Sequence, residues 1–154
     1  MAQNDIANNI NSTQLITPGN LTATNNTDTL DTQFMNGSML VLNMGNSSDT
    51  LSGSVYWTLI LQDSPDDSAW TAVTSNTSVT YGTVNTSTGV YATIDAPSED
   101  TRLFKIGYVG PQRYVRIAIT ATGSMSSGTI MAVTGYTSPI HKPSSGGDDG
   151  SPTG

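Results

Sequence analysis

The chain has 154 residues and no cysteine. This absence excludes a disulfide framework, a thiolate nucleophile and a metal site with thiolate ligands. The single histidine, His141, stands beside Lys142 and Pro143 at the start of a polar tail. A zinc site or a catalytic triad needs several groups converging on one rigid place, so we expect neither from His141.

Motifs that mark catalysis or membrane insertion are also missing. The sequence has no phosphate-binding loop, no G-x-S-x-G elbow, no H-E-x-x-H pair and no apolar run near 18 residues. The first ten residues, MAQNDIANNI, lack the basic and apolar regions of a signal peptide, so we expect none. We therefore predict a protein that is not an enzyme and has no metal site and no cofactor.

Charge is scarce and mostly of one sign. Charged residues make up 11% of the chain, against about 25% on average. Twelve acids and five bases give a net charge of −7 and an isoelectric point near 4.1. Because such a surface repels phosphates and anionic lipids, we expect no nucleic-acid partner and no membrane partner.

Four of the five bases fall within one short stretch: Arg102, Lys105, Arg113 and Arg116. One interpretation is a contact patch for an acidic partner. The other is ordinary charge on the polar face of two neighbouring strands, paired with Glu99, Asp100 or Asp95. We favour the second, because so few bases rarely form a nucleic-acid site.

Ser, Thr and Asn take the place of charge, with 19, 24 and 12 residues. They are poor helix formers, whereas Thr, Val, Tyr and Trp favour strands. Residues 54–62 alternate, with Val55, Trp57, Leu59 and Leu61 on one face. Similar runs predict further strands at 38–43, 70–75, 79–84, 90–95, 102–109, 113–120 and 128–136, and a helical turn is expected near 97–100.

Turn signals separate these strands every 8–12 residues or so, which is typical of an antiparallel sandwich or barrel. We predict an all-β antiparallel β-sandwich, and alternation alone leaves jelly-roll and immunoglobulin-like topologies open. We predict three parts along the chain: a polar arm over 1–14, a sandwich over 15–140 that starts with a weak hairpin at 14–32, and a flexible tail over 141–154.

Acidic and aromatic residues offer candidate sites that structural interpretations explain better. Asp63, Asp66 and Asp67 match no EF-hand spacing, so we favour a turn with Asx caps over a calcium loop. Glu99 and Asp100 are adjacent and are expected to be solvated loop charges rather than a hydrolytic pair. Trp57 alternates with apolar residues and is predicted to lie in the core. Trp70 begins a strand after an acidic loop, so both a core position and a sugar-stacking ring stay open for it.

Two stretches carry a family resemblance: LILQDSPDDSAWTAV at 59–73 and IGYVGPQRYVRI at 106–117. Together they resemble small structural proteins of tailed bacteriophages, some of which are capsid cement or decoration proteins, over about residues 15–137. The Asn-rich arm and the Gly- and Asp-rich tail depart from that pattern. The same stretches resemble discoidin-type jelly rolls, whose sugar and calcium residues find no match here, and this resemblance favours the jelly roll.

The resemblance implies a virion structural protein that binds the major capsid protein on the outer surface of the capsid and stabilises the head. A homo-oligomer, preferably a trimer, is expected to multiply weak contacts. Residues 1–32 are the candidate contact segment, ordered by strand addition to a neighbour. The alternatives are a carbohydrate-binding adhesion module and a component of the tail or neck.

Overall fold

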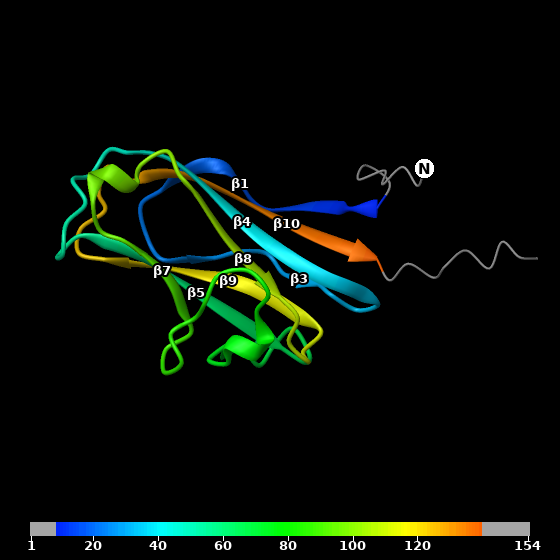
Figure 1. Cartoon of the computed structure of the whole chain (residues 1–154). Helices are drawn as coiled ribbons and strands as arrows, with labels where there is room; N and C mark the ends of the chain where they lie inside the picture. The colour runs from blue at the N-terminus through cyan, green and yellow to red at the C-terminus, as the bar shows by residue number, and fades with distance from the viewer. Residues whose placement is uncertain (1–8, 140–154) are drawn as a thin grey trace, which may run out of the picture.

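The computed structural model describes residues 9–139, which are almost entirely strand and turn. The elements follow in the order β1 (Asn11–Leu21), β2 (Asn25–Asn26), β3 (Leu30–Asp31), β4 (Met35–Ser47), β5 (Tyr56–Ser64), β6 (Thr71–Ala72), η1 (Asn76–Ser78), β7 (Val90–Ile94), η2 (Pro97–Glu99), β8 (Leu103–Tyr108), β9 (Tyr114–Thr122) and β10 (Thr129–Pro139). Within residues 9–139, no helix is long and apolar enough to cross a membrane. Figure 1 shows the strands packed in two layers, which confirms the predicted all-β sandwich.

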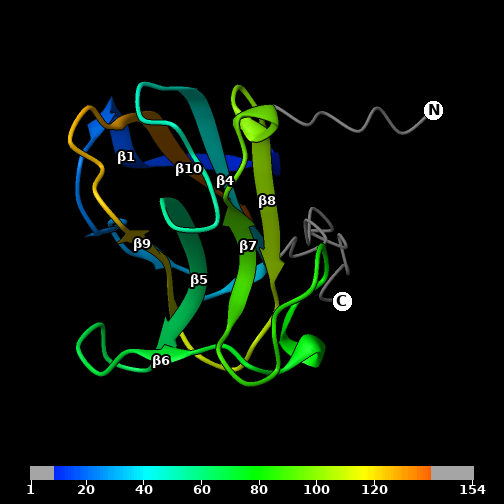
Figure 2. The same ribbon diagram turned by 90° about the vertical axis from the view of Figure 1, so that its left-hand side faces the viewer.

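The strand order is that of a jelly roll. Sheet A has the order β1-β10-β4-β8, and sheet B has the order β2-β9-β5-β6, with β3 also on β9 and β7 on β5. All of these pairings are antiparallel, and Figure 2 shows β4 beside β8 and β7 beside β5. The first strand therefore pairs with the last, and the strands between them pair in nested fashion, as in the double Greek key of a jelly roll. An immunoglobulin-like sandwich divides its strands differently between the sheets, so the preference for a jelly roll is confirmed.

Alternating side chains fill the space between the two sheets, as the period-two pattern predicts. Trp57, Leu59 and Leu61 of β5 have no exposed surface, whereas their neighbours in sequence are only partly buried. On the adjacent strand β9, three alternate residues also have no exposed surface: Val115, Ile117 and Ile119. Burial of this apolar surface at about 25 cal/mol per Å² is the main force that holds the two layers together.

The hairpin predicted over 14–32 is wrong. β1 pairs with β10 in sheet A, whereas β2 and β3 pair with β9 in sheet B, so the chain crosses between the sheets after Leu21. Leu15 and Leu30 explain the crossing, because they enter the core from opposite sheets and are 1% and 3% exposed. The boundary predicted between arm and sandwich also falls inside β1, since Asn11–Gln14 already pair with β10.

The strand predicted over 79–84 does not form. Only a bridge between Val79 and Tyr108 is present, beside hydrogen bonds from Thr80 N to Gly107 O and from Gly107 N to Tyr81 O. Gly82 follows with φ of +79°, a left-handed conformation that turns the chain away from β8. The helical turn predicted near 97–100 is confirmed as η2.

One end of the sandwich gathers the start of β1, the end of β10 and the start of β4. Asn11 lies opposite Thr137, and Pro139 lies opposite Met35. His141 and the tail predicted over 141–154 lie outside the described residues, as do residues 1–8 of the arm. The β3–β4 turn therefore lies beside the points where β1 begins and β10 ends.

Candidate functional site

The three acids of the β5–β6 loop do not converge on a cation. Asp66 Oδ1 accepts hydrogen bonds from the backbone N–H groups of Ser68 and Ala69, at 3.0 and 2.8 Å, and these bonds lower the pKa of Asp66. Asp63 and Asp67 turn to other partners. Between residues 9 and 139, no three His, Cys, Asp or Glu residues come together as metal ligands would. The prediction of an Asx-capped turn is confirmed.

Glu99 has a role in its own loop. Its carboxylate accepts a hydrogen bond of 2.9 Å from the backbone N–H of Asp95 and lies 3.8 Å from the guanidinium of Arg102. The ion pair is the one that the sequence predicts for Arg102. Both contacts are local, which agrees with a loop charge rather than an acid presented to a cleft.

The basic stretch does not form one patch, because β8 and β9 belong to different sheets. The prediction that its bases lie on two neighbouring strands is therefore wrong. Each of the four instead lies over an aromatic ring, 4.1–5.8 Å from the ring centroid: Arg102 over Phe104, Lys105 over Tyr81, Arg113 over Tyr114 and Arg116 over Trp70. Such cation–π contacts hold these bases against their own surface.

The two tryptophans differ in burial. Trp57 has no exposed surface, as predicted, and its Nε1 donates a hydrogen bond of 3.0 Å to Thr129 Oγ1. The ring of Trp70 is partly exposed, but the Arg116 guanidinium lies 4.1 Å from its centroid. Arg116 is fixed there by a hydrogen bond of 2.9 Å to Gln62. One face of Trp70 is therefore already covered, and only the other could stack on a sugar.

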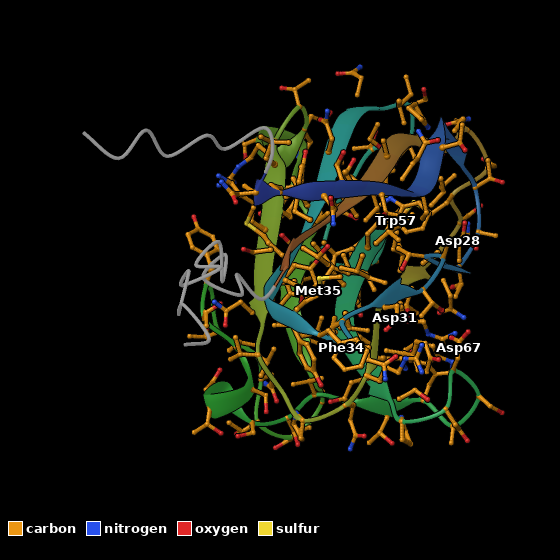
Figure 3. All side chains as sticks on the ribbon, turned by 90° about the vertical axis from the view of Figure 1, so that its right-hand side faces the viewer. Asp28, Asp31, Phe34, Met35, Trp57 and Asp67 are labelled. Atoms are coloured by element: carbon orange, nitrogen blue, oxygen red, sulfur yellow. The ribbon has the colours of Figure 1, made fainter. Side chains whose placement is uncertain are left out.

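The β3–β4 turn, residues 32–35, presents an aromatic ring to solvent. Phe34 is 74% exposed, and its φ is +62°. Met35 N donates a hydrogen bond of 3.1 Å to Thr32 O, which closes a four-residue turn with Phe34 in the third position. A turn with positive φ at that position usually carries Gly or Asn, because a bulky side chain there costs of order 1–3 kcal/mol. We call residues 32–35 the Phe34 turn (Figure 3).

Hydrogen bonds to the β8–β9 loop hold the Phe34 turn in this strained form. Arg113 pairs with Asp31 through Nη2 at 2.7 Å and Nε at 3.0 Å, and this hydrogen bonding lowers the pKa of Asp31. The backbone N–H and hydroxyl of Thr32 both donate to Arg113 O, at 2.8 and 2.7 Å. Strain of this kind persists only where the surroundings fix the backbone, and it is most often found at functional sites.

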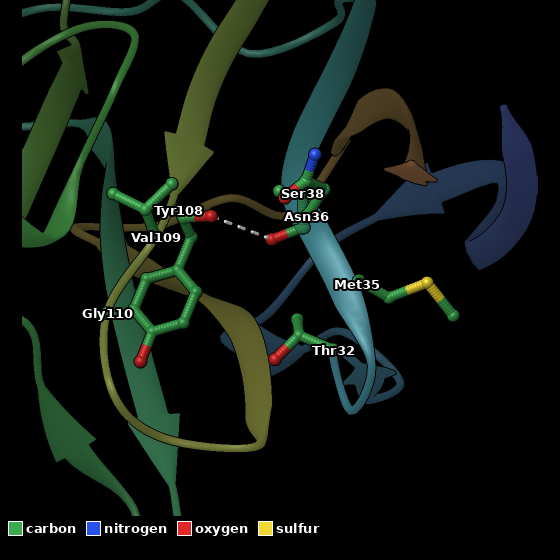
Figure 4. Close-up of a pocket in the computed structure, with 8 residues that line it drawn as sticks. Thr32, Met35, Asn36, Ser38, Tyr108, Val109 and Gly110 are labelled. Carbon is green, nitrogen blue, oxygen red and sulfur yellow. Dashed lines mark hydrogen bonds between the residues drawn. The ribbon is translucent and has the colours of Figure 1, made fainter. Parts of the chain in front are cut away.

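A polar hollow of about 130 Å³ lies behind the Phe34 turn (Figure 4). Its wall includes Met35, Ser38 and Tyr108, and Ser38 Oγ donates a hydrogen bond of 3.1 Å to Tyr108 O. The Tyr108 hydroxyl donates to Asp63 Oδ2 at 2.7 Å, and burial raises the pKa values of both groups. Its volume is well below the ~300–1,000 Å³ of a small-molecule pocket.

Gly110 lets the β8–β9 loop cross the Tyr108 ring at this hollow. A Cβ atom at Gly110 would lie 2.5 Å from three atoms of that side chain, so no larger residue fits without moving the loop or the ring. The loop therefore depends on a glycine to hold Arg113 against the Phe34 turn.

A second depression lies on the outer face of sheet A, and we call it the outer groove. It has a volume of about 260 Å³ and a mainly carbon surface, with Ile10, Met39 and Tyr136 among the residues that line it. Gly37 lines both the hollow and the groove, so the two are neighbours along β4. Both are smaller than the ~300–1,000 Å³ of a small-molecule pocket, and the groove suits a single side chain.

Sequence reasoning did not find Phe34. The residue stands in the segment Thr32-Gln33-Phe34-Met35, which has neither Gly nor Asn, so no turn signal marks it. The available signals were the polar residues just before Phe34 and the Asn36-Gly37 pair just after it, which favour a loop over a strand. The turn at Phe34 joins β3 of sheet B to β4 of sheet A, and the sequence pattern did not predict this crossing between the sheets.

The fold and the site together define an antiparallel jelly roll with a projecting aromatic turn and an apolar groove at one end. No family model matches the chain, and no curated protein matches it. Among solved structures it is similar to the crystal structure of the SPBc2 prophage-derived protein YomS, with 12% identity and a TM-score of 0.46, over 83% of this chain and 91% of that one.

Proposed function

We propose that this chain is a structural protein of a bacteriophage virion, a cement or decoration protein that binds the major capsid protein on the outer surface of the head. The observation that carries the proposal is the end of the sandwich at the Phe34 turn, where a strained backbone exposes Phe34 beside two hollows smaller than a small-molecule pocket. Exposed aromatic anchors of this kind are typical of protein–protein contacts. The sequence resemblance to phage structural proteins supplies the biological setting.

The charge of the chain favours the outer wall of a capsid. A net charge of −7 is repelled by packaged DNA on the inner wall, and the four described bases lie over aromatic rings rather than facing outward as a cluster. A protein that binds the assembled shell and not its separate subunits stabilises the shell by mass action. The proposed module is therefore a binder with no catalytic step.

The outer edge of β1 is a second surface suited to a capsid neighbour. β1 is the end strand of sheet A, and its first residues, Asn11–Gln14, are exposed and uncharged. Devices that protect an edge strand come only later in β1, as bulges after Gln14 and Ile16 and as Pro18. The first part of the edge can therefore accept an extended segment by strand addition.

The carbohydrate-binding alternative has less support, because Arg116 covers one face of the Trp70 ring. A glycan array separates the two functions: an adhesion module gives a signal that Trp70→Ala removes, whereas a cement protein gives none. No such signal is expected from the chain.

Imaging of virions tests the location. Phage carrying a C-terminally tagged copy of the chain are labelled with a gold-conjugated antibody and viewed by negative-stain electron microscopy. We expect label spread over the head. Label confined to the neck or tail would favour a tail component, and unlabelled virions would contradict a virion protein altogether.

A further inference from the structure

We propose that Phe34 of one copy packs into the outer groove of a second copy, and that this contact closes the homo-oligomer. The sequence predicts a homo-oligomer, and the proposal goes beyond the proposed function by naming the surface that forms it. It does not depend on capsid binding, since it concerns the purified chain alone.

The fold of a single copy does not need Phe34 where it stands. The ring is 74% exposed and the residue has a φ of +62°, so a single copy bears both the hydration of an apolar surface and backbone strain. Asp67, which has nearly the same φ of +61°, is a residue type that tolerates this conformation, and its carboxylate accepts a hydrogen bond from Thr29. Packing of the Phe34 ring against a partner accounts for the cost that the isolated copy bears.

The outer groove has the chemistry that a Phe ring requires. Its surface is mainly carbon, and its volume of about 260 Å³ suits one large side chain. The residues that line it are all uncharged, and they include Ile10, Met39 and Tyr136. The Phe34 turn is uncharged as well, with the sequence Thr32-Gln33-Phe34-Met35.

Charge restricts where two copies of the chain can meet, and it leaves this uncharged surface as the place of contact. Each copy carries a net charge of −7, so two copies repel each other over most orientations. An uncharged turn against an uncharged groove brings no charged side chain of either surface into contact. The ion pair between Asp31 and Arg113 at the base of the turn also leaves no net charge there.

The positions of turn and groove favour a closed assembly. Phe34 precedes β4, and Gly37, three residues later, lines the groove. Turn and groove thus lie at the same end of the sandwich, so the proposed contacts between copies gather at that end. A closed ring satisfies every turn and every groove, whereas an open filament leaves one of each unpaired.

Two substitutions disrupt the contact from opposite sides and leave the fold intact. Phe34→Gly removes the ring at a φ that Gly adopts freely. Gly37→Tyr fills the groove: a Cβ atom at Gly37 meets nothing within 4 Å, and its φ is not in the left-handed region. Leu103→Ser is the matched control, because Leu103 is 55% exposed and lies outside the groove.

Sedimentation equilibrium of the purified full-length chain and its three variants tests the proposal, with thermal unfolding to show that each is folded. We expect the unaltered chain and Leu103→Ser to form closed oligomers. Phe34→Gly and Gly37→Tyr are expected to dissociate at least about 30-fold more readily, the effect of losing one hot-spot contact. A monomeric unaltered chain, or oligomers retained by either groove or turn variant, would overturn the proposal.

The same variants separate this inference from the proposed function. If the oligomer forms through Phe34 but tagged virions carry no label, the interface stands and the virion role fails. Deletion of residues 1–8 gives a further check, because Ile10, two positions after them in the sequence, lines the groove. An oligomer that needs residues 1–8 and not Phe34 would show that the arm, rather than the ring, occupies the groove.

Discussion

Trp57 and Phe34 are both aromatic, and the fold treats them in opposite ways. Trp57 has no exposed surface and satisfies its one polar atom through Thr129, whereas Phe34 is 74% exposed on a left-handed backbone. The first arrangement lowers the free energy of the isolated chain and the second raises it. The comparison separates the centre of the sandwich, which serves stability, from its β3–β4 end, for which we propose contact with other molecules.

The largest effect is expected at Trp57. Trp57→Ala removes the bulkiest buried side chain and leaves Thr129 and Ser47 without the indole N–H that completes their hydrogen-bonded cluster. We expect a loss of about 3–5 kcal/mol of unfolding free energy, measured by urea denaturation. Phe34→Gly is the comparison variant. A loss of similar size there would mean that Phe34 is part of the core after all.

The same contrast explains how much the sequence predicts. Core positions such as Trp57, Leu59 and Leu61 follow from strict alternation, because a one-residue slip would expose all of them. The hairpin at 14–32 failed because pairing in a jelly roll joins strands far apart in sequence: β1 lies against β10, and β3 against β9. Local pattern cannot identify such partners.

The candidate site was harder to predict than the core. The bases were expected on neighbouring strands. Arg102 directly precedes β8 and Arg113 directly precedes β9, and only the topology shows that these two strands belong to different sheets. The ion pair of Arg113 with Asp31 spans 82 positions in sequence and has no local signal. The Asx turn at Asp66 was predictable because its hydrogen bonds reach only two and three residues ahead.

Tyr108 connects the two regions and is expected to show an intermediate effect. Its ring is 2% exposed, and its hydroxyl donates to Asp63 at 2.7 Å beside the Phe34 turn. Tyr108→Phe keeps the ring but leaves a half-buried carboxylate without this donor. We expect a loss of about 1–2 kcal/mol in urea unfolding at pH 7.

Asp63→Asn provides the control for Tyr108→Phe. An amide oxygen still accepts the Tyr108 hydrogen bond, and the substitution removes the carboxylate whose pKa burial raises. An acid with a raised pKa in the folded state reduces stability when it ionises, so Asp63→Asn is expected to cost little at pH 7. A loss as large as that of Tyr108→Phe would indicate that the charge itself, rather than the hydrogen bond, holds this end of the core.

The smallest effect is expected at the base of the Phe34 turn, where it appears only in acid. Hydrogen bonding to Arg113 lowers the pKa of Asp31 in the folded chain, so the pair stabilises the fold above the unfolded pKa near 3.9. That contribution is lost as the pH falls from about 4 through the lower folded pKa. Because both side chains are more than two-fifths exposed, we expect less than about 1 kcal/mol. The urea midpoint of unfolding should decrease less between pH 7 and pH 2.5 in Asp31→Asn than in the unaltered chain. An equal decrease would show that the acid sensitivity does not arise at the turn.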